Sequence, residues 1–258
     1  MQAGFISQIG RLMLGPITTI GSYSIFVGQG LKSIVVPMVD LRLVFQQLEF
    51  VGNKSFSIII LAGVMVGGIF GFQLGEIFKI FGAESMIGAA AGFALSRELA
   101  PMVGAFLVTG RAGSAMAAEI ATMRVNEQID AMRVMSVNPY EYLIAPRILA
   151  SIVFMPVLDV FFIVAGVLSA FFIGVVFYHI DVADFLAKIQ WIVATSDIVK
   201  GMQKSAVFGL LFSSIGCFQG YFATGGAKGV GKATTKAVVI SYVCILVADY
   251  LISYLQFT

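Results

Sequence analysis

The sequence predicts an all-α integral membrane protein, and its composition indicates this before any motif is considered. Hydrophobic residues make up 59% of the 258 positions, whereas charged residues make up only 12%. A typical soluble domain is about 45–50% apolar and about 25% charged, and a disordered chain is less hydrophobic still. The formal net charge of +2 leaves no basic excess to neutralise phosphates, so we expect no nucleic-acid partner.

Five apolar stretches are predicted to span the membrane, because a spanning helix needs about 20 apolar residues. They are Ser55–Gly75, continuing to about Phe81, Ser85–Ala118, Ile148–Tyr178, Ser205–Ala227 and Ala237–Phe257. We therefore expect one transmembrane domain over residues 1–258, with a five-span bundle at 55–257 and an N-terminal interfacial region at 1–54.

The N-terminal region has the pattern of an interfacial helix, and no signal peptide is expected before it. Its apolar residues recur on one helical face, namely Phe5, Ile9, Leu12 and Met13. Pro16 is expected to end this helix. The weaker stretch Ile17–Val36 is diluted by polar residues. We expect it to lie in or re-enter the interface, with a sixth span as the alternative.

Lys and Arg indicate the orientation of the spans. They are numerous before the first span, at 111–147 and at 225–236, whereas the two intervening loops carry only Lys79 and Lys188. Cytoplasmic loops carry the excess of basic residues. We therefore expect the N-terminus in the cytoplasm and the C-terminus on the far side.

Glycines form a stripe on the first span. Every fourth residue from 63 to 75 is glycine: Gly63, Gly67, Gly71 and Gly75. Small residues let helix backbones approach closely in lipid. The stripe therefore predicts a packing seam, either within the chain or between two copies.

Ionisable residues lie inside or at the edge of the spans: Arg97, Glu98, Asp159, Lys204 and Asp249. Each is expected to face protein or water, because an isolated charge is costly in the bilayer. Lys204 and Asp249 fall at similar depth and are predicted to pair. Two interpretations stay open for Arg97 and Glu98, a packing pair or a polar rim of a substrate cavity.

Residues 124–138 are predicted to form a short amphipathic helix between the second and third spans. Asn126 is its expected N-cap, and Asn138-Pro139 its expected end. One face carries Val125, Ile129 and Met132, and the other carries Glu127, Asp130 and Arg133. Such a helix either floats on the lipid surface or inserts into a groove of a soluble partner.

The sequence predicts no enzyme activity of its own. Gly226–Ala233 resembles a phosphate-binding loop, but Ala233 replaces the required Ser or Thr, so we expect only a glycine-rich cytoplasmic turn. The two cysteines, Cys217 and Cys244, lie in apolar runs, and His179 is the single histidine. We therefore expect no metal site, no catalytic residues and no cofactor.

Three motifs resemble one family. They are Arg97-Glu-Leu-Ala-Pro101, the long run from Thr109 through Arg111, Glu119 and Arg124 to Arg133, and the pairs Asn138-Pro139 and Pro146-Arg147. This combination is similar to the MlaE (YrbE-like) permease family of phospholipid ABC transporters. Gly225–Thr235 is similar to that family's turn before its last helix. The resemblance covers most of the chain from about Ser55.

The resemblance implies a homodimeric permease in the inner membrane of Gram-negative bacteria, with its C-terminus in the periplasm. Its implied partners are a cytoplasmic ABC ATPase, a STAS-domain accessory protein and a periplasmic ring of MCE-domain lipid-binding subunits. The implied function is phospholipid movement between the inner and outer membranes, which maintains outer-membrane lipid asymmetry, with ATP hydrolysed by the separate subunit.

The resemblance also implies roles for individual residues. Residues 126–137 become the helix that couples to the ATPase, with Glu127, Ile129, Asp130, Met132 and Arg133 as contacts. An outward-opening lipid cavity is expected at the ends of the first two spans, lined by Phe70, Ile77, Phe78, Phe81, Arg97, Glu98 and Leu99.

Two other functions are alternatives to the one that the resemblance implies. An ion- or proton-coupled secondary carrier would use Glu98, Asp159 and Asp249 as relay carboxylates. Five spans fit an inverted repeat poorly, and such a carrier leaves the amphipathic helix unexplained. The other alternative is a membrane scaffold that transports nothing.

Overall fold

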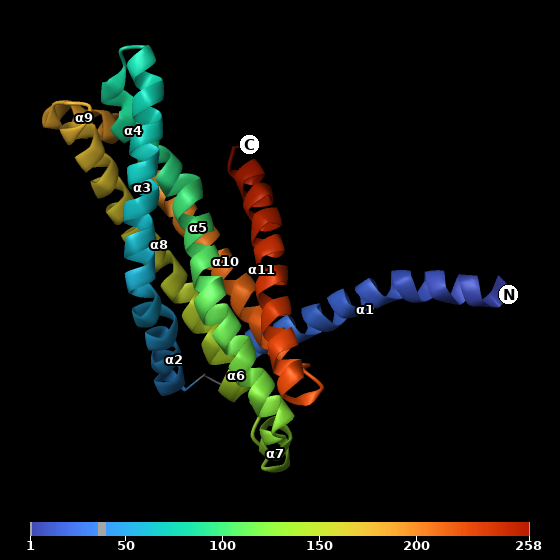
Figure 1. Cartoon of the computed structure of the whole chain (residues 1–258). Helices are drawn as coiled ribbons and strands as arrows, with labels where there is room; N and C mark the ends of the chain where they lie inside the picture. The colour runs from blue at the N-terminus through green and yellow to red at the C-terminus, as the bar shows by residue number, and fades with distance from the viewer. Residues whose placement is uncertain (1, 36–39, 258) are drawn as a thin grey trace.

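The fold is all-helical and matches the predicted class. The computed structural model describes residues 2–35 and 40–257, with side chains for 17–35 and 40–256. No strand occurs in these residues. The α-helices, labelled in Figure 1, are α1 Gln2–Val35, α2 Leu41–Leu48, α3 Lys54–Ile80, α4 Ile87–Ala94, α5 Ala100–Val108, α6 Ser114–Val125, α7 Gln128–Val134, α8 Ala145–Val176, α9 Val182–Ile192, α10 Thr195–Tyr221 and α11 Gly226–Phe257.

Short helical turns of other kinds join several of these helices into longer continuous segments. One is a 3₁₀ turn at Glu84–Met86, and the others are π-helical: η1 Glu49–Asn53, η3 Leu95–Leu99, η4 Thr109–Gly113 and η5 Tyr140–Ile144. Four of the resulting segments in the described part of the chain are long and apolar enough to cross a membrane. They are Leu41–Ile80, Glu84–Val125, Tyr140–Val176 and Gly226–Gln256.

The fifth predicted span, Ser205–Ala227, corresponds to α10, which is less apolar than the other four segments. This helix begins at Thr195 and ends at Tyr221, so both predicted ends were wrong. It runs the length of the bundle and packs against α5, α6, α8 and α11. Its polar residues, such as Lys204 and Ser213, are buried against these neighbours. A helix sheltered by protein in this way needs less hydrophobicity than one that faces lipid.

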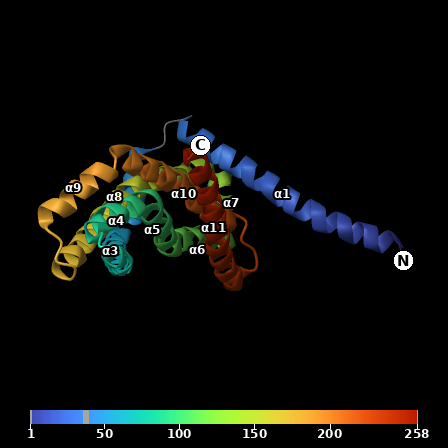
Figure 2. The same ribbon diagram turned by 90° about the horizontal axis from the view of Figure 1, so that it is seen from above.

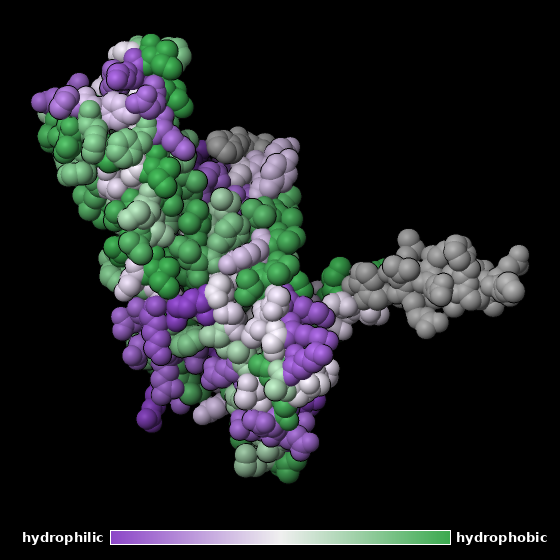
Figure 3. All heavy atoms as spheres, viewed as in Figure 1, coloured by the Kyte–Doolittle hydropathy of each residue, from purple (hydrophilic) through white to green (hydrophobic). Residues whose placement is uncertain are grey.

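The long segments alternate in direction between two ends of the bundle. One end carries α7 and the other carries α9 and the C-terminus (Figure 1). Figure 3 shows a band of hydrophobic side chains across the bundle, with hydrophilic ones gathered toward the α7 end. The central core takes at least one fully buried side chain from each long segment: Ile59, Leu95, Phe162, Phe208 and Ile245.

Helix α1 leaves the bundle instead of crossing the membrane with it. Figures 1 and 2 show it running across the bundle's long axis and away from it. Among the described residues it is not one of the helices long and apolar enough to cross a membrane, and its direction agrees with the interfacial interpretation of Ile17–Val36. The expected stop at Pro16 was wrong, because one helix continues from Gln2 to Val35. The face predicted from Phe5 to Met13 lies outside the described side chains.

The C-terminal half of α1 is anchored to the bundle. The Tyr23 hydroxyl lies 2.6 Å from the Ser214 hydroxyl of α10. Phe26 is buried among Tyr140, Phe218 and Tyr221. This aromatic cluster, which also packs around Ile129 of α7, fixes the angle at which α1 meets the bundle.

The glycine stripe of α3 is a seam within the chain. All four glycines are buried, and they face α8. A Cβ on Gly63 would lie 2.8 Å from the Phe162 carbonyl oxygen, and a Cβ on Gly67 would overlap the backbone of Gly166. The two backbones therefore touch, and this face is closed to a second copy of the chain.

The start of α11 also differs from the prediction. The segment 226–233, expected as a glycine-rich turn, is helical from Gly226. The turn lies before this helix and ends at Gly225, with φ 93, and at the first helical residue Gly226, with φ 65. Such positive φ values favour glycine.

We predict that Gly67→Leu destabilises the fold, because its side chain has no room against the Gly166 backbone. The expected loss is about 2–3 kcal/mol of unfolding free energy, typical of overpacking a tight core, and it is measured by denaturation in detergent. Gly28→Leu is the matched control, since nothing lies within 4 Å of a Cβ there. Equal stability of the two variants would contradict the seam.

Candidate functional site

An ionic cluster joins three segments in the half of the bundle near the C-terminus. At its centre is Lys204 of α10, whose side chain is 0% exposed. Its Nζ lies 2.6 Å from Glu98 Oε2 in η3 and 3.1 Å from Asp249 Oδ1 in α11. It also donates to Ser253 Oγ at 2.7 Å. The structure thus brings together the predicted partners Lys204 and Asp249 and adds Glu98.

Arg97 turns away from Glu98, although the two are adjacent in sequence. Its Nε lies 2.9 Å from Asp197 Oδ1 at the start of α10, and its guanidinium lies 5.0 Å from the centre of the Phe93 ring. Asp197 also accepts a hydrogen bond from the backbone N–H of Ala194. Arg97 and Glu98 are therefore not one packing pair, because each is bound to a different part of α10.

Proline chemistry explains why the chain is π-helical at Arg97 and Glu98. Pro101 has no backbone N–H, and its ring would collide with the carbonyl four residues earlier, which is that of Arg97. The π-helical turn η3 at Leu95–Leu99 stands immediately before it. Such bulges accommodate this conflict and are frequent at functional sites. The π-helical turn thus directs the Arg97 side chain to α10 and the Glu98 side chain to α10 and α11.

Asp159 of α8 faces the same cluster from the opposite side. It is 2% exposed, and neither carboxylate oxygen accepts a hydrogen bond. A Cβ on Gly201 would lie 3.4 Å from Asp159 Oδ2 and would overlap the Ser96 carbonyl. Glycine at 201 therefore allows η3, α8 and α10 to meet. Lys204 thus pairs with Glu98 and Asp249 from two segments, and the Asp159 carboxylate lies one helical turn away beside Gly201.

The remaining cavity residues predicted from sequence lie elsewhere. Phe78 packs with Ile87, Ile180 and Phe185 at the α9 end, whereas Leu99 packs on the central core. Ile77 and Phe81 are 52% and 75% exposed near the end of α3, and Phe70 is half-buried. This chain therefore places the aromatic candidates and the charged ones in two separate groups.

The predicted amphipathic helix at 124–138 is much shorter in the structure. Helix α7 covers only Gln128–Val134. Asn126 ends α6 instead of capping α7, and Glu127 between them has φ 60, a sharp turn that interrupts one continuous helix. Asn138 caps the next turn by accepting from the backbone N–H of Tyr140 at 3.0 Å.

The apolar face of this loop also points inward. Ile129 is 0% exposed and packs with Met132 in the aromatic cluster beside Tyr221, so Ile129 cannot contact a partner. Arg133 donates to the Tyr221 hydroxyl, and Asp130 pairs with Arg124 at 2.7 Å. The apolar side chains left outward are Val134 and Met135, at 86% and 67% exposed.

Comparison with known proteins assigns the family. The profile of the permease MlaE family matches residues 44–255. The chain belongs to the MlaE permease family. A Rickettsia felis protein named "Probable ABC transporter permease protein" is 36% identical over 257 residues, covering 100% of this chain and 99% of its own length.

More distant organisms carry similar proteins. A Synechocystis relative with the same kind of name is 37% identical over 230 residues, covering 89% of this chain and 88% of its own. The chloroplastic Arabidopsis thaliana protein TRIGALACTOSYLDIACYLGLYCEROL 1 is 39% identical over 232 residues, 90% of this chain and 66% of its own. The present chain is thus an ABC transporter permease, and this class works with an ATPase partner.

Sequence reasoning missed the partners that Glu98 and Arg97 find in the permease, Ser253 and Asp197, although signals for both were present. Ser253 lies four residues after Asp249, on the same helical face, and donates to Glu98. Asp197 lies seven residues before Lys204, which is two helical turns. Among the described residues, no group of three or more His, Cys, Asp or Glu side chains is arranged to hold a metal ion.

We predict that Lys204→Met destabilises the permease by about 3–5 kcal/mol, the usual effect of removing one partner from a buried ion pair. Glu98 and Asp249 would then face each other without a cation. Adding Asp249→Asn should recover part of the loss, as measured by denaturation in detergent. Lys79→Met is the control, because Lys79 is exposed. A Lys204→Met variant as stable as the control would disprove the structural importance of the cluster.

Proposed function

We propose that this permease moves phospholipid between the inner and outer membranes of a Gram-negative bacterium and so maintains outer-membrane lipid asymmetry. The observation that supports this most is the family match over residues 44–255. On this proposal the chain works as a homodimer, with a cytoplasmic ABC ATPase, a STAS-domain protein and a periplasmic MCE-domain ring. The inner membrane is its proposed location.

The proposed orientation places the α7 end in the cytoplasm and the α9 end, with the C-terminus, in the periplasm. Basic residues support it, because Arg124, Arg133 and Lys228 lie toward the α7 end, and cytoplasmic loops are enriched in Lys and Arg. The exposed apolar face of α11 is the surface on which we propose that a second copy packs. Its apolar residues Val243, Val247 and Leu251 are each more than half exposed.

We propose that the α7 loop seats the ATPase through different residues from those expected. Ile129 is buried within the permease, whereas Val134 and Met135 protrude beside a short helix that is held rigidly. Rigidity comes from Arg133 on Tyr221 and from the Arg124–Asp130 pair. Glu127, Asp130 and Arg133 remain accessible for polar contacts at the rim of this surface.

A double substitution tests this coupling surface. Val134→Asp with Met135→Asp should reduce ATPase co-purification by roughly tenfold or more, since burying unpaired charges at an interface costs several kcal/mol. The permease should still insert, because both side chains are exposed. Val182→Asp, at an exposed position of α9, is the control at the opposite end. Undiminished co-purification would show that the ATPase binds elsewhere.

The substrate site is proposed to include Arg97, Glu98 and Leu99, with the aromatic group at the end of α3 as a second part. A guanidinium suits phosphate recognition, and Arg97 is held by Asp197, whose carboxylate a phosphate would replace. Two copies are needed to bring the separated groups around one cavity. A secondary carrier is the less supported function. The ionic cluster gives no specific evidence for ion or proton coupling, whereas the family match supports an ABC transporter permease.

Photocrosslinking tests the substrate site. A benzoylphenylalanine at position 99 of the assembled transporter should give a phospholipid adduct, and Arg97→Ala should lower its yield severalfold. The same probe at position 168, where Leu168 is 62% exposed on α8, reports bulk lipid and should be insensitive to Arg97→Ala. An adduct at 99 that persists unchanged in Arg97→Ala would remove Arg97 from the substrate site.

A further inference from the structure

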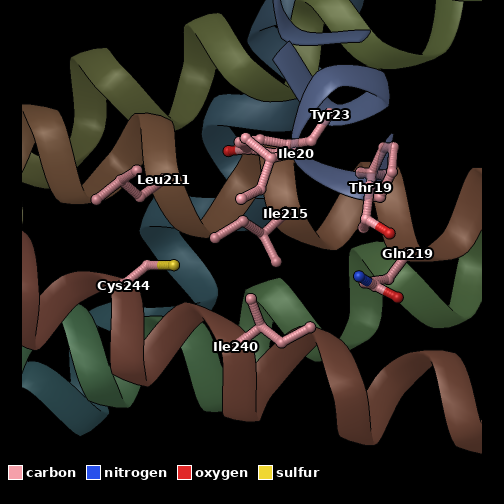
Figure 4. A pocket seen from close by; sticks show the side chains of 9 residues that line it. Thr19, Ile20, Tyr23, Leu211, Ile215, Gln219, Ile240 and Cys244 are labelled. Carbon is pink, nitrogen blue, oxygen red and sulfur yellow. The ribbon is translucent and has the colours of Figure 1, made fainter. Parts of the chain in front are cut away.

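A cleft opens where α1 diverges from the bundle. Its volume is about 190 Å³, and side chains from α1, α10 and α11 converge on it (Figure 4). Its lining consists of Thr19, Ile20, Tyr23, Leu211, Ile215, Phe218, Gln219, Ile240 and Cys244. The cleft lies far along α10 from the ionic cluster, because Leu211 and Gln219 are two and four turns beyond Lys204.

The open surface of the cleft is apolar, and the side chains of Thr19 and Gln219 stand together at one end of its lining. Helix α10 runs toward the α7 end, so Gln219 lies about 12 Å nearer to that end than Leu211 does. In Figure 4, Thr19 lies on the Gln219 side, and Cys244 lies toward Leu211. A neighbouring hollow is lined by Thr18, Thr19 and Ser22, together with Phe218 and Phe222, and it is more polar than the cleft. An apolar cleft beside a more polar hollow matches a molecule with an apolar chain and a polar head.

Lysines stand at the Gln219 end of the cleft. Residues four apart share a helical face, so Lys232 and Lys236 continue the face of α11 that carries Ile240 and Cys244 into the cleft. Both lysines are exposed, and they form no ion pair with any part of the chain that the structure describes. Two carboxylates near this end are matched by arginines, Glu119 by Arg147 and Asp130 by Arg124.

We propose that this cleft binds an anionic phospholipid of the cytoplasmic leaflet, separate from the transported lipid. Lys232 and Lys236 would meet the headgroup, Gln219 and the α1 hydroxyls its glycerol region, and Ile240, Ile215 and Leu211 an acyl chain. This proposal rests on the membrane orientation of the permease given under the proposed function. Lipid binding in the cleft, however, does not depend on the ATPase.

The size and charge of the cleft favour lipid over a protein helix as occupant. An apolar cavity of about 150 Å³ holds a benzene-sized molecule, so this space fits a length of one acyl chain. A helix with its side chains is about 10 Å across and does not fit inside it. The unmatched lysines add an electrostatic preference for an anionic headgroup over a zwitterionic one.

The test measures lipid retained by the purified full-length permease. The protein is placed in nanodiscs of phosphatidylethanolamine with a minor fraction of phosphatidylglycerol, then extracted gently for native mass spectrometry. We expect phosphatidylglycerol to be enriched on the wild type. Each lysine near an anionic headgroup is worth roughly a fivefold change in affinity, so Lys232→Gln with Lys236→Gln should reduce retention by roughly tenfold or more.

Two controls make the outcome decisive. Lys79→Gln with Lys188→Gln removes the same charge at the opposite end of the bundle and should leave retention unchanged. Ile240→Trp fills the cleft without changing charge and should also release the lipid. Retention that falls equally in the control pair, or that survives in both cleft variants, would overturn the proposal.

A photocrosslinker at position 240 identifies the occupant directly. A phosphatidylglycerol adduct supports the proposal, whereas an adduct with a second copy or with another protein's helix refutes it. Because these measurements use the permease alone, their failure is distinguishable from failure of the ATPase-coupled function, which the α7 loop variants report.

Discussion

The buried cation of Lys204 is the constraint around which the C-terminal half of the bundle is arranged. A fully desolvated ammonium is costly unless carboxylates pair with it, and here Glu98 and Asp249 do so from two different segments. Each contact fixes both the depth and the rotation of the helix that supplies it. Glycine at 201 is needed one turn away because the segments meet so closely there.

Helix α8 combines two means of packing in lipid. On the α3 side, small residues allow backbone contact, as at Gly67 against Gly166, and the attraction is mainly van der Waals packing. On the α10 side the backbones also meet closely, because a Cβ on Gly209 would lie 2.5 Å from the Ser151 carbonyl oxygen. This side additionally carries the buried carboxylate of Asp159. Helix α8 is therefore close-packed on both faces, and one of them also contains a buried charged group.

The features that sequence predicted well depend on spacing along one helix. Apolar length located the long segments, the four-residue glycine period located the seam, and depth counting put Lys204 beside Asp249. The features it missed depend on contacts between distant segments. Glu98 could not be assigned to Lys204 instead of Arg97 without knowing the local π-helical turn. The inward direction of Ile129 followed from Tyr221, 92 residues later, and the early start of α11 followed from two glycines with positive φ.

The anchoring of α1 has a consequence for biosynthesis. The Tyr23 hydroxyl meets Ser214 across 191 positions of sequence, and Phe26 packs on Tyr140, Phe218 and Tyr221. Chains are made from the N-terminus at about 5–20 residues per second, so α1 leaves the ribosome roughly ten seconds or more before its docking partners exist. A helix suited to the membrane surface can stay bound there during that interval. Helix α1 is therefore the first part of the chain to reach the bilayer and among the last to dock on the bundle.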